Sequence, residues 1–286
     1  MLALAGMLGL CASQGLCAQD VPAQEIAAQE IAAQDIAARD MPSQGLSAQE
    51  GHGVAEASAP LAPELALMGT IPIYWGEAHS LDDLLSVDTH GHWARAVIER
   101  QFHLRPLDYL SAEALAGRER LLLAQPRGFA PEENVALDAW LRAGGRLLLF
   151  ADPYMTGESH FALGDRRRPQ DVALLSPILA HWGLELTYDS LQPDRVQARD
   201  FAGTALPVRL AGRFELTGEA PDCRVFAEGL LADCTFGAGR AVIVADAAML
   251  DLVDPAAGSQ AALEYLLGHV FGDQAGNAVQ SARGGE

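Results

Sequence analysis

Two histidines and an aspartate stand close together in the segment Asp88-Thr89-His90-Gly91-His92. Imidazole and carboxylate groups are common zinc ligands, and a loop of this length can bring Asp88, His90 and His92 onto one ion. No second pair of ligands at a diagnostic spacing accompanies them. The alternative is a helix start, with Asp88 or Thr89 as N-cap and the histidines partly exposed. The sequence favours this helix start and keeps the metal site as a second hypothesis.

A further group of polar residues follows the apolar runs that we expect to form buried strands. In an open α/β sheet, ligands bind beyond the carboxyl ends of the strands. Carboxylates with one arginine can bind a small polar molecule there or perform acid–base chemistry. The structural alternative is that Asp152 and Asp246 cap turns, with Arg127 paired to one of them. The candidate ligand-binding residues are Glu77, Gln125, Arg127, Asp152 and Asp246.

The usual nucleophile of such a fold is a cysteine or serine on a tight turn after a buried strand. No cysteine lies between residues 18 and 222, and no G-x-S-x-G motif is present. The apolar runs are followed by Gln125-Pro126 and Ala151-Asp152 instead. No glycine-rich phosphate loop follows any of them, so we expect neither nucleophilic catalysis nor a cofactor.

The elements that must position these residues are clearest between Arg118 and Pro153. Leu121–Ala124 is a short apolar run typical of a strand covered on both faces. A helix follows, with Pro131 in its first turn, and Gly144-Gly145 ends it. Leu147–Phe150 is a second buried strand. A unit this compact predicts a right-handed crossover between parallel strands.

The rest of the domain continues this α/β pattern. A mostly parallel sheet is predicted up to about residue 190, and antiparallel hairpins follow it toward the C-terminus. The predicted strands are 65–75, 104–109, 184–189 and 240–246, and the predicted helices are 91–101, 171–182 and 259–271.

One hairpin brings two cysteines together. With Glu228-Gly229 as a two-residue turn, residues that face each other have numbers that sum to 457, so Cys223 faces Cys234. Cysteines opposite each other on paired strands are within disulfide reach and oxidise in an exported protein. In this register we expect a hydrogen-bonded pair. The alternative is two half-buried thiols.

Charge and composition exclude some partners. The chain has 286 residues, half of them hydrophobic, and a formal net charge of −19. Nucleic acid and anionic membrane surfaces need a basic face, so neither is expected as a partner. The sequence leaves the oligomeric state open.

The N-terminal region predicts export. Residues 1–18 are apolar and uncharged, typical of a signal peptide or an N-terminal anchor. Residues 19–64 contain a five-residue repeat that gives no buried face on a helix or a strand, so we expect a low-complexity linker. The α/β domain follows at 65–272, with a disordered tail at 273–286. The expected location is the periplasm, either free or membrane-anchored facing it.

Two segments, LLLAQPRGFAPEENVALDAWLRAGGRLLLFADP (121–153) and GAGRAVIVADAAMLDL (237–252), resemble the extracytoplasmic auxiliary domain of ABC-type transport systems of the GldG-like type. The resemblance implies a class I glutamine amidotransferase-like domain. This is a flavodoxin-like three-layer α/β fold whose members often lack the nucleophilic cysteine. It also implies an ABC transporter permease or another envelope protein as partner.

These observations predict a non-catalytic exported domain that binds a ligand or partner, accessory to an ABC-type transport system. One alternative is a hydrolase or metal-dependent enzyme that uses Asp88, His90 and His92 or the strand-end carboxylates. A second alternative is a structural scaffold module with the repeat as a spacer.

Overall fold

The computed structural model describes residues 62–76, 91–157, 159, 161–165, 167–218, 222–251 and 256–272. The predicted N-terminal segment 1–18, nearly all of the predicted linker and the tail 273–286 lie outside the described residues. Everything described belongs to the unit Ser58–Glu286. Within it, no helix is both long and apolar enough to cross a membrane.

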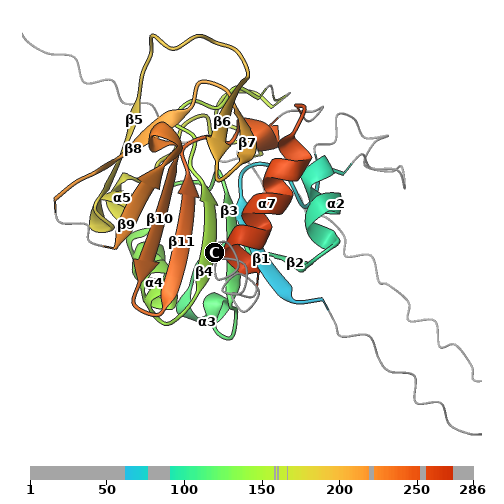
Figure 1. Ribbon diagram of the computed structural model, residues 1–286. Helices are drawn as coiled ribbons and strands as arrows, with labels where there is room; N and C mark the ends of the chain where they lie inside the picture. The colour runs from blue at the N-terminus through green and yellow to red at the C-terminus, as the bar shows by residue number, and fades with distance from the viewer. Residues whose placement is uncertain are drawn as a thin grey trace, which may run out of the picture. The chain divides into compact units, whose positions relative to one another are not determined.

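A seven-stranded sheet forms the centre of the domain (Figure 1). Its first five strands are parallel, β10 runs antiparallel to β11, and β9 runs antiparallel to β10. The parallel part has the 2-1-3-4-5 order of flavodoxin-like folds, which confirms the predicted fold class. In spatial order the strands are β2 (His103–Pro106), β1 (Glu64–Gly69), β3 (Arg120–Ala124), β4 (Arg146–Phe150), β11 (Gly239–Val244), β10 (Leu231–Phe236) and β9 (Cys223–Phe226).

Helices cover both faces of this sheet. Successive strand residues point to opposite faces, so Leu122 and Leu148 pack into one core, while Leu121 and Leu147 pack into the other. This explains why the parallel strands are continuously apolar. One core contains α2 (Trp93–Glu99) and α7 (Ser259–Phe271). The other contains α3 (Ala112–Leu115), α4 (Pro131–Arg142) and α5 (Ser176–His181).

The unit β3-α4-β4 forms as the sequence predicts, with Pro131 as the first helical residue. The helix ends at Arg142, and Gly144 takes a left-handed φ of 118°. Gly145 must also lack a side chain, because a Cβ there would lie 2.5 Å from the Trp140 ring. The chain can therefore turn directly from α4 into β4.

Among the predicted boundaries, two differ most from the structure. The first strand ends at Gly69, not at residue 75, because residues 71–76 form a turn in which the Gly76 N–H donates to the Pro72 carbonyl. Trp75 is consequently 76% exposed. The predicted helix 171–182 shortens to α5, whose first turn holds Pro177. A proline starts a helix more easily than it continues one.

The antiparallel hairpins lie beyond the carboxyl ends of β4 and β11, at the top of Figure 1. The N–H of Gly212 donates to the carbonyl of Ala245, the residue after β11, which fixes this position. These hairpins pair β5 (Leu184–Tyr188) with β8 (Gly212–Leu216), and β6 (Gln197–Phe201) with β7 (Thr204–Val208). A short helix α6 (Ala248–Asp251) and the turn η1 (Ala227–Gly229) complete the elements.

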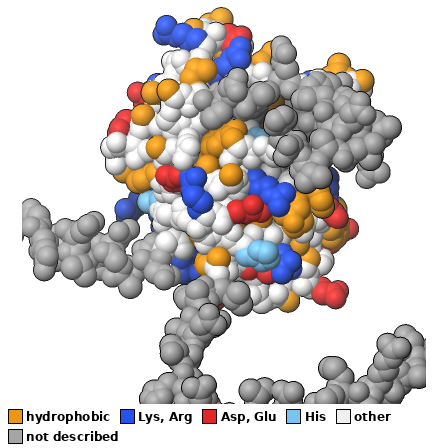
Figure 2. Space-filling view, turned by 90° about the vertical axis from the view of Figure 1, so that its right-hand side faces the viewer, with side chains coloured by type: hydrophobic (Ala, Val, Ile, Leu, Met, Phe, Trp, Pro, Cys, Tyr) orange, Lys and Arg blue, Asp and Glu red, His pale blue; other side chains and the backbone are white. Residues whose placement is uncertain are grey.

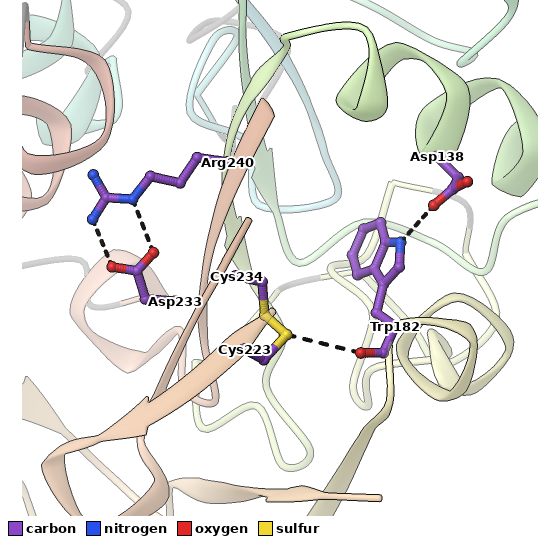
Figure 3. Close-up of a disulfide and its surroundings, with 6 residues drawn as sticks. All are labelled: Asp138, Trp182, Cys223, Asp233, Cys234 and Arg240. Atoms are coloured by element: carbon purple, nitrogen blue, oxygen red, sulfur yellow. Dashed lines mark hydrogen bonds and ion pairs between the residues drawn. A yellow bond between two sulfur atoms is a disulfide. The ribbon is translucent and has the colours of Figure 1, made fainter. Parts of the chain in front are cut away.

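The structure joins Cys223 and Cys234 by a disulfide between β9 and β10, in the predicted register (Figure 3). The prediction that the two cysteines form a hydrogen-bonded pair of the ladder is wrong. The N–H of Thr235 donates to the carbonyl of Asp222, so that neighbouring pair is hydrogen-bonded and the cysteine pair is not. The turn at η1 is not part of the β9–β10 ladder, because Leu230 adopts a helical conformation. The turn therefore does not determine which residue pairs of the ladder are hydrogen-bonded.

The disulfide packs against the helical layer. The sulfur of Cys223 lies 3.8 Å from the carbonyl oxygen of Trp182, and the indole Nε1 of Trp182 donates to Asp138 of α4 at 3.0 Å (Figure 3). Trp182 also stacks on Phe236 of β10. Trp182, at the end of α5, therefore connects the cross-linked strands to α4.

A charged cluster connects β10 and β11 to α7. Arg240 of β11 donates twice to Asp233 of β10, at 2.9 and 2.6 Å, and its Nη2 lies 2.7 Å from His269 Nε2. Burial works to raise the pKa of Asp233, but the hydrogen bonds from Arg240 outweigh it and the pKa falls to about 2. The charged form of Asp233 thus favours the folded chain.

Removal of the disulfide should lower the free energy of unfolding by about 2–3 kcal/mol, because the closed loop is short. The measurement is urea unfolding of the double variant Cys223→Ala/Cys234→Ala against the native chain. Reducing agent should lower the native value and leave the variant unchanged. Equal stability of the two proteins would show that the cysteines are unpaired thiols.

The Asp233–Arg240 pair should contribute to stability in one pH window. Because the pKa is depressed in the folded state, the contribution of about 2 kcal/mol is present above about pH 4 and is lost as pH falls toward 2. Urea unfolding of Asp233→Asn and of the native chain should therefore differ at pH 6 and converge near pH 2. Asp108→Asn, at an exposed loop position, is the control and should follow the native chain throughout.

Candidate functional site

Three of the predicted site residues converge at the carboxyl edge of the parallel sheet. Gln125, Asp152 and Asp246 follow β3, β4 and β11, and all three are buried. The Gln125 amide bridges the first two strands: its Nε2 donates to the Asp152 carbonyl at 2.9 Å, and its Oε1 accepts from the Asp152 N–H at 2.7 Å. The sequence placed these side chains correctly because each directly follows a buried apolar run.

The carboxylates of Asp152 and Asp246 accept hydrogen bonds from backbone N–H groups. Asp152 accepts from the N–H groups of Tyr154 and Ala247, at 2.8 and 2.9 Å. Asp246 accepts from the N–H groups of Ala248 and Arg209, at 2.8 and 3.0 Å. Each carboxylate caps the turn that follows it and fastens a segment distant in sequence, as the structural alternative predicts. Buried N–H groups that would otherwise be unsatisfied are thereby paired.

The chain crosses the point where the strand order reverses, between β1 and β3. In flavodoxin-like folds this switch point is the usual ligand crevice. Here the Thr70 hydroxyl donates to the Gln125 carbonyl at 2.5 Å and accepts from the Gln170 N–H at 2.8 Å. The Gln125 amide also donates to the Gln170 carbonyl at 3.0 Å. The loop before α5 is therefore hydrogen-bonded to the residues that follow β1 and β3.

Arg127 does not pair with Asp152 or Asp246, which corrects the expectation. Its guanidinium forms a two-point ion pair with Glu133 of α4, at 2.7 and 2.9 Å. Burial works to raise the pKa of Glu133, but hydrogen bonds from Arg127 and from two backbone N–H groups outweigh it and lower this pKa. Glu133 is nearer than either aspartate because α4 starts four residues after Arg127. The pair orients the start of α4 instead of facing a ligand.

The structure describes only part of the predicted metal site. Glu77, Asp88 and His90 lie outside the described residues. His92 is the N-cap of α2, where the sequence favoured Asp88 or Thr89. Its Nδ1 accepts from the Ala94 N–H, and its Nε2 donates to the Leu250 carbonyl, so both nitrogens already have partners.

Burial lowers the pKa of His92, although the bond to Leu250 acts in the opposite direction. The histidine is therefore held neutral as a link between α2 and α6. Across the described part of the chain, no three His, Cys, Asp or Glu side chains are grouped to hold a metal ion.

A small pocket lies beside this edge, and sequence reasoning missed it. Its volume is about 120 Å³. Its walls come from the β5–β8 hairpin, from β6 and from the turn at η1. No local motif could reveal it, because its charged residues meet only when these separate segments pair. The lining residues are Asp189, Gln192, Arg199, Ala211, Gly212, Arg213, Ala227, Glu228 and Leu230.

An exposed aromatic pair stands near the same edge. The rings of Tyr154 and Tyr188 stack with centroids 5.5 Å apart and planes 7° apart. We call this pair the aromatic ledge. Tyr154 is held in place by its N–H bond to Asp152, and Leu191 beyond β5 is 91% exposed. Large exposed aromatic and aliphatic groups are typical of protein contact surfaces.

Acidic and basic side chains are interspersed on the face of the domain seen in Figure 2. Two ion pairs on α2 and α7, Arg95–Glu99 and Arg100–Glu264, show this pattern. Because each pair joins opposite charges, the electrostatic fields of its two side chains cancel locally.

The site therefore has two parts of different character. The buried part, around Gln125, Asp152 and Asp246, is saturated with backbone hydrogen bonds and braces the loops. The open part consists of the pocket and the aromatic ledge. Both cysteines of the described region are joined in the disulfide, so neither offers a thiolate.

Comparison with known proteins gives a weak likeness. No family model and no curated protein match the chain. Among solved structures, it is similar to the exo-β-1,4-mannosidase Op5Man5 from Opitutaceae bacterium strain TAV5 (TM-score 0.43, 15% identity, 72% of this chain and 36% of that chain). It is also similar to a β-galactosidase from Rahnella sp. R3 (0.42, 14%, 73% and 31%).

A third similar structure is a ThuA-like protein from Bacteroides uniformis ATCC 8492 (TM-score 0.42, 9% identity, 77% of this chain and 97% of that chain). The chain spans about a third of the length of the two glycosidases. At these values the likeness carries no conclusion about activity.

Asp152→Asn should destabilise the protein by about 1–3 kcal/mol, because the new NH₂ group faces one of the two N–H donors and leaves it unsatisfied. Thermal and urea unfolding measure the loss. Asp108→Asn is the matched control at an exposed position. Unchanged stability of Asp152→Asn would contradict a bracing role and favour a functional one.

Proposed function

We propose that this chain is a non-catalytic binding domain, which uses the carboxyl edge of its sheet to bind a ligand or partner. The observation that carries the proposal is the full engagement of the strand-end side chains. The carboxylates of Asp152 and Asp246 each accept two backbone hydrogen bonds, and Gln125 bridges two strands. A general acid or base must reach a substrate, and these groups are buried against the backbone.

Export of the domain is part of this proposal. A disulfide between β9 and β10 is typical of an oxidising compartment, and the apolar, uncharged residues 1–18 suit an export signal or an anchor. We propose a periplasmic location, either free or anchored.

The proposed partner is an ABC transporter permease or another envelope protein. The resemblance of residues 121–153 and 237–252 to the GldG-like auxiliary domain motivates this choice. The aromatic ledge and Leu191 offer an apolar contact area on the open side of the edge. The acidic net charge of the chain disfavours nucleic acid in the same role.

Photo-cross-linking in intact cells tests the partner. A photoreactive phenylalanine analogue at Leu191, beside the ledge, should give a discrete adduct with an envelope protein, identified by mass spectrometry. The matched control is the same analogue at Val135, which is 70% exposed on α4 and does not line the pocket. An adduct at Leu191 alone would agree with the proposal. Equal labelling at both positions, or none, would contradict it.

A further inference from the structure

The pocket beside the sheet edge holds two opposite charges that form no salt bridge within the described part of the chain. Asp189 and Arg213 both line the pocket: Asp189 directly follows β5, and Arg213 lies in β8, next to the last residue pair of the two strands, Tyr188 with Gly212. Among the described residues, neither Asp189 nor Arg213 forms an ion pair.

The other polar groups of the pocket are already engaged. Arg199 pairs with Glu228 at 2.6 Å. The Gln192 amide donates to the carbonyls of Asp189 and Ala211, at 3.0 and 2.9 Å. Asp189 Oδ1 accepts the N–H of Leu191 at 2.8 Å, which fixes the carboxylate. The pocket thus has fixed walls with one anionic and one cationic group left to interact with a ligand.

Gly229 leaves room for the cation. It is buried with a left-handed φ of 99°, and a Cβ there would lie 3.0 Å from Arg213 Cβ and 3.3 Å from its Nε. The turn at η1 therefore packs directly on the Arg213 side chain and limits its directions.

We propose that this pocket binds a small zwitterion, a free amino acid of the size of glycine or alanine. The ligand carboxylate meets the Arg213 guanidinium, and the ligand ammonium meets the Asp189 carboxylate. This assignment rests on the proposed binding role of the domain and names the class of its ligand.

Size and charge both favour this class. A pocket of about 120 Å³ is smaller than the roughly 300–1,000 Å³ of drug-sized sites, so it holds only a few heavy atoms. The paired charges of a zwitterion match Arg213 and Asp189 together. A phosphate or sulfate would meet the carboxylates of Asp189 and Glu228 as well as the arginines, and like charges repel. A simple cation would likewise meet both arginines.

Isothermal titration calorimetry of the full-length protein tests the assignment. The probes are glycine and L-alanine, with acetate and methylammonium as single-charge controls. Glycine or alanine should bind saturably, and each single-charge probe should bind at least tenfold more weakly because it lacks one of the two charge contacts. Acetate that binds as well as glycine would overturn the zwitterion assignment, and so would the absence of saturable binding by either amino acid.

Variants locate the binding. Arg213→Gln and Asp189→Asn should each weaken amino-acid binding by about tenfold or more, and Asn at 189 keeps the acceptor for the Leu191 N–H. Arg195→Gln, an exposed arginine on the neighbouring loop outside the pocket, should bind like the native chain. Binding that survives both pocket variants would overturn the site. Failure here, combined with a discrete adduct at Leu191, would leave the proposed partner role intact and remove only the ligand.

Discussion

Where strands leave a sheet that helices cover on both faces, the buried backbone N–H groups of the following loops still need hydrogen-bond acceptors. This requirement governs the carboxyl edge of the domain. The loops that leave β3, β4 and β11 carry N–H groups into a region shielded from water. Gln125, Asp152 and Asp246 supply the acceptors for these groups. Because each side chain binds a segment far away in sequence, the same hydrogen bonds also hold the loops in one arrangement.

This bracing changes where a ligand can approach. At the switch point between β1 and β3, Thr70 and Gln170 complete a hydrogen-bonded bridge over the strand ends. The polar groups that remain accessible lie beside this edge, at the paired strands β5 and β8 and at the turn η1. The residues there are charged, partly exposed and positioned by backbone turns.

The antiparallel end of the sheet is stabilised by different means. β9 and β10 are joined by the Cys223–Cys234 disulfide, and Arg240 clamps Asp233 next to α7. Parallel strands obtain their stability from two hydrophobic cores, whereas β9 lies at an edge with less apolar cover. The covalent link stabilises β9, and the partly buried ion pair stabilises the neighbouring β10–β11 pair. The pocket turn at η1 leads directly into β10, so the cross-linked end also supports the proposed binding surface.

The sequence by itself determined the features that depend on neighbouring residues. Apolar runs bounded by Pro131 and Gly144-Gly145 specified β3-α4-β4, and the arithmetic of one hairpin placed Cys223 opposite Cys234. It also put Gln125, Asp152 and Asp246 at strand ends. Only the tertiary structure decided that the first strand stops at Gly69, that Arg127 pairs with Glu133, and that Asp189 and Arg213 share a pocket. Periodicity and caps act over a few residues, whereas these outcomes depend on which distant segments touch, and that is fixed by packing.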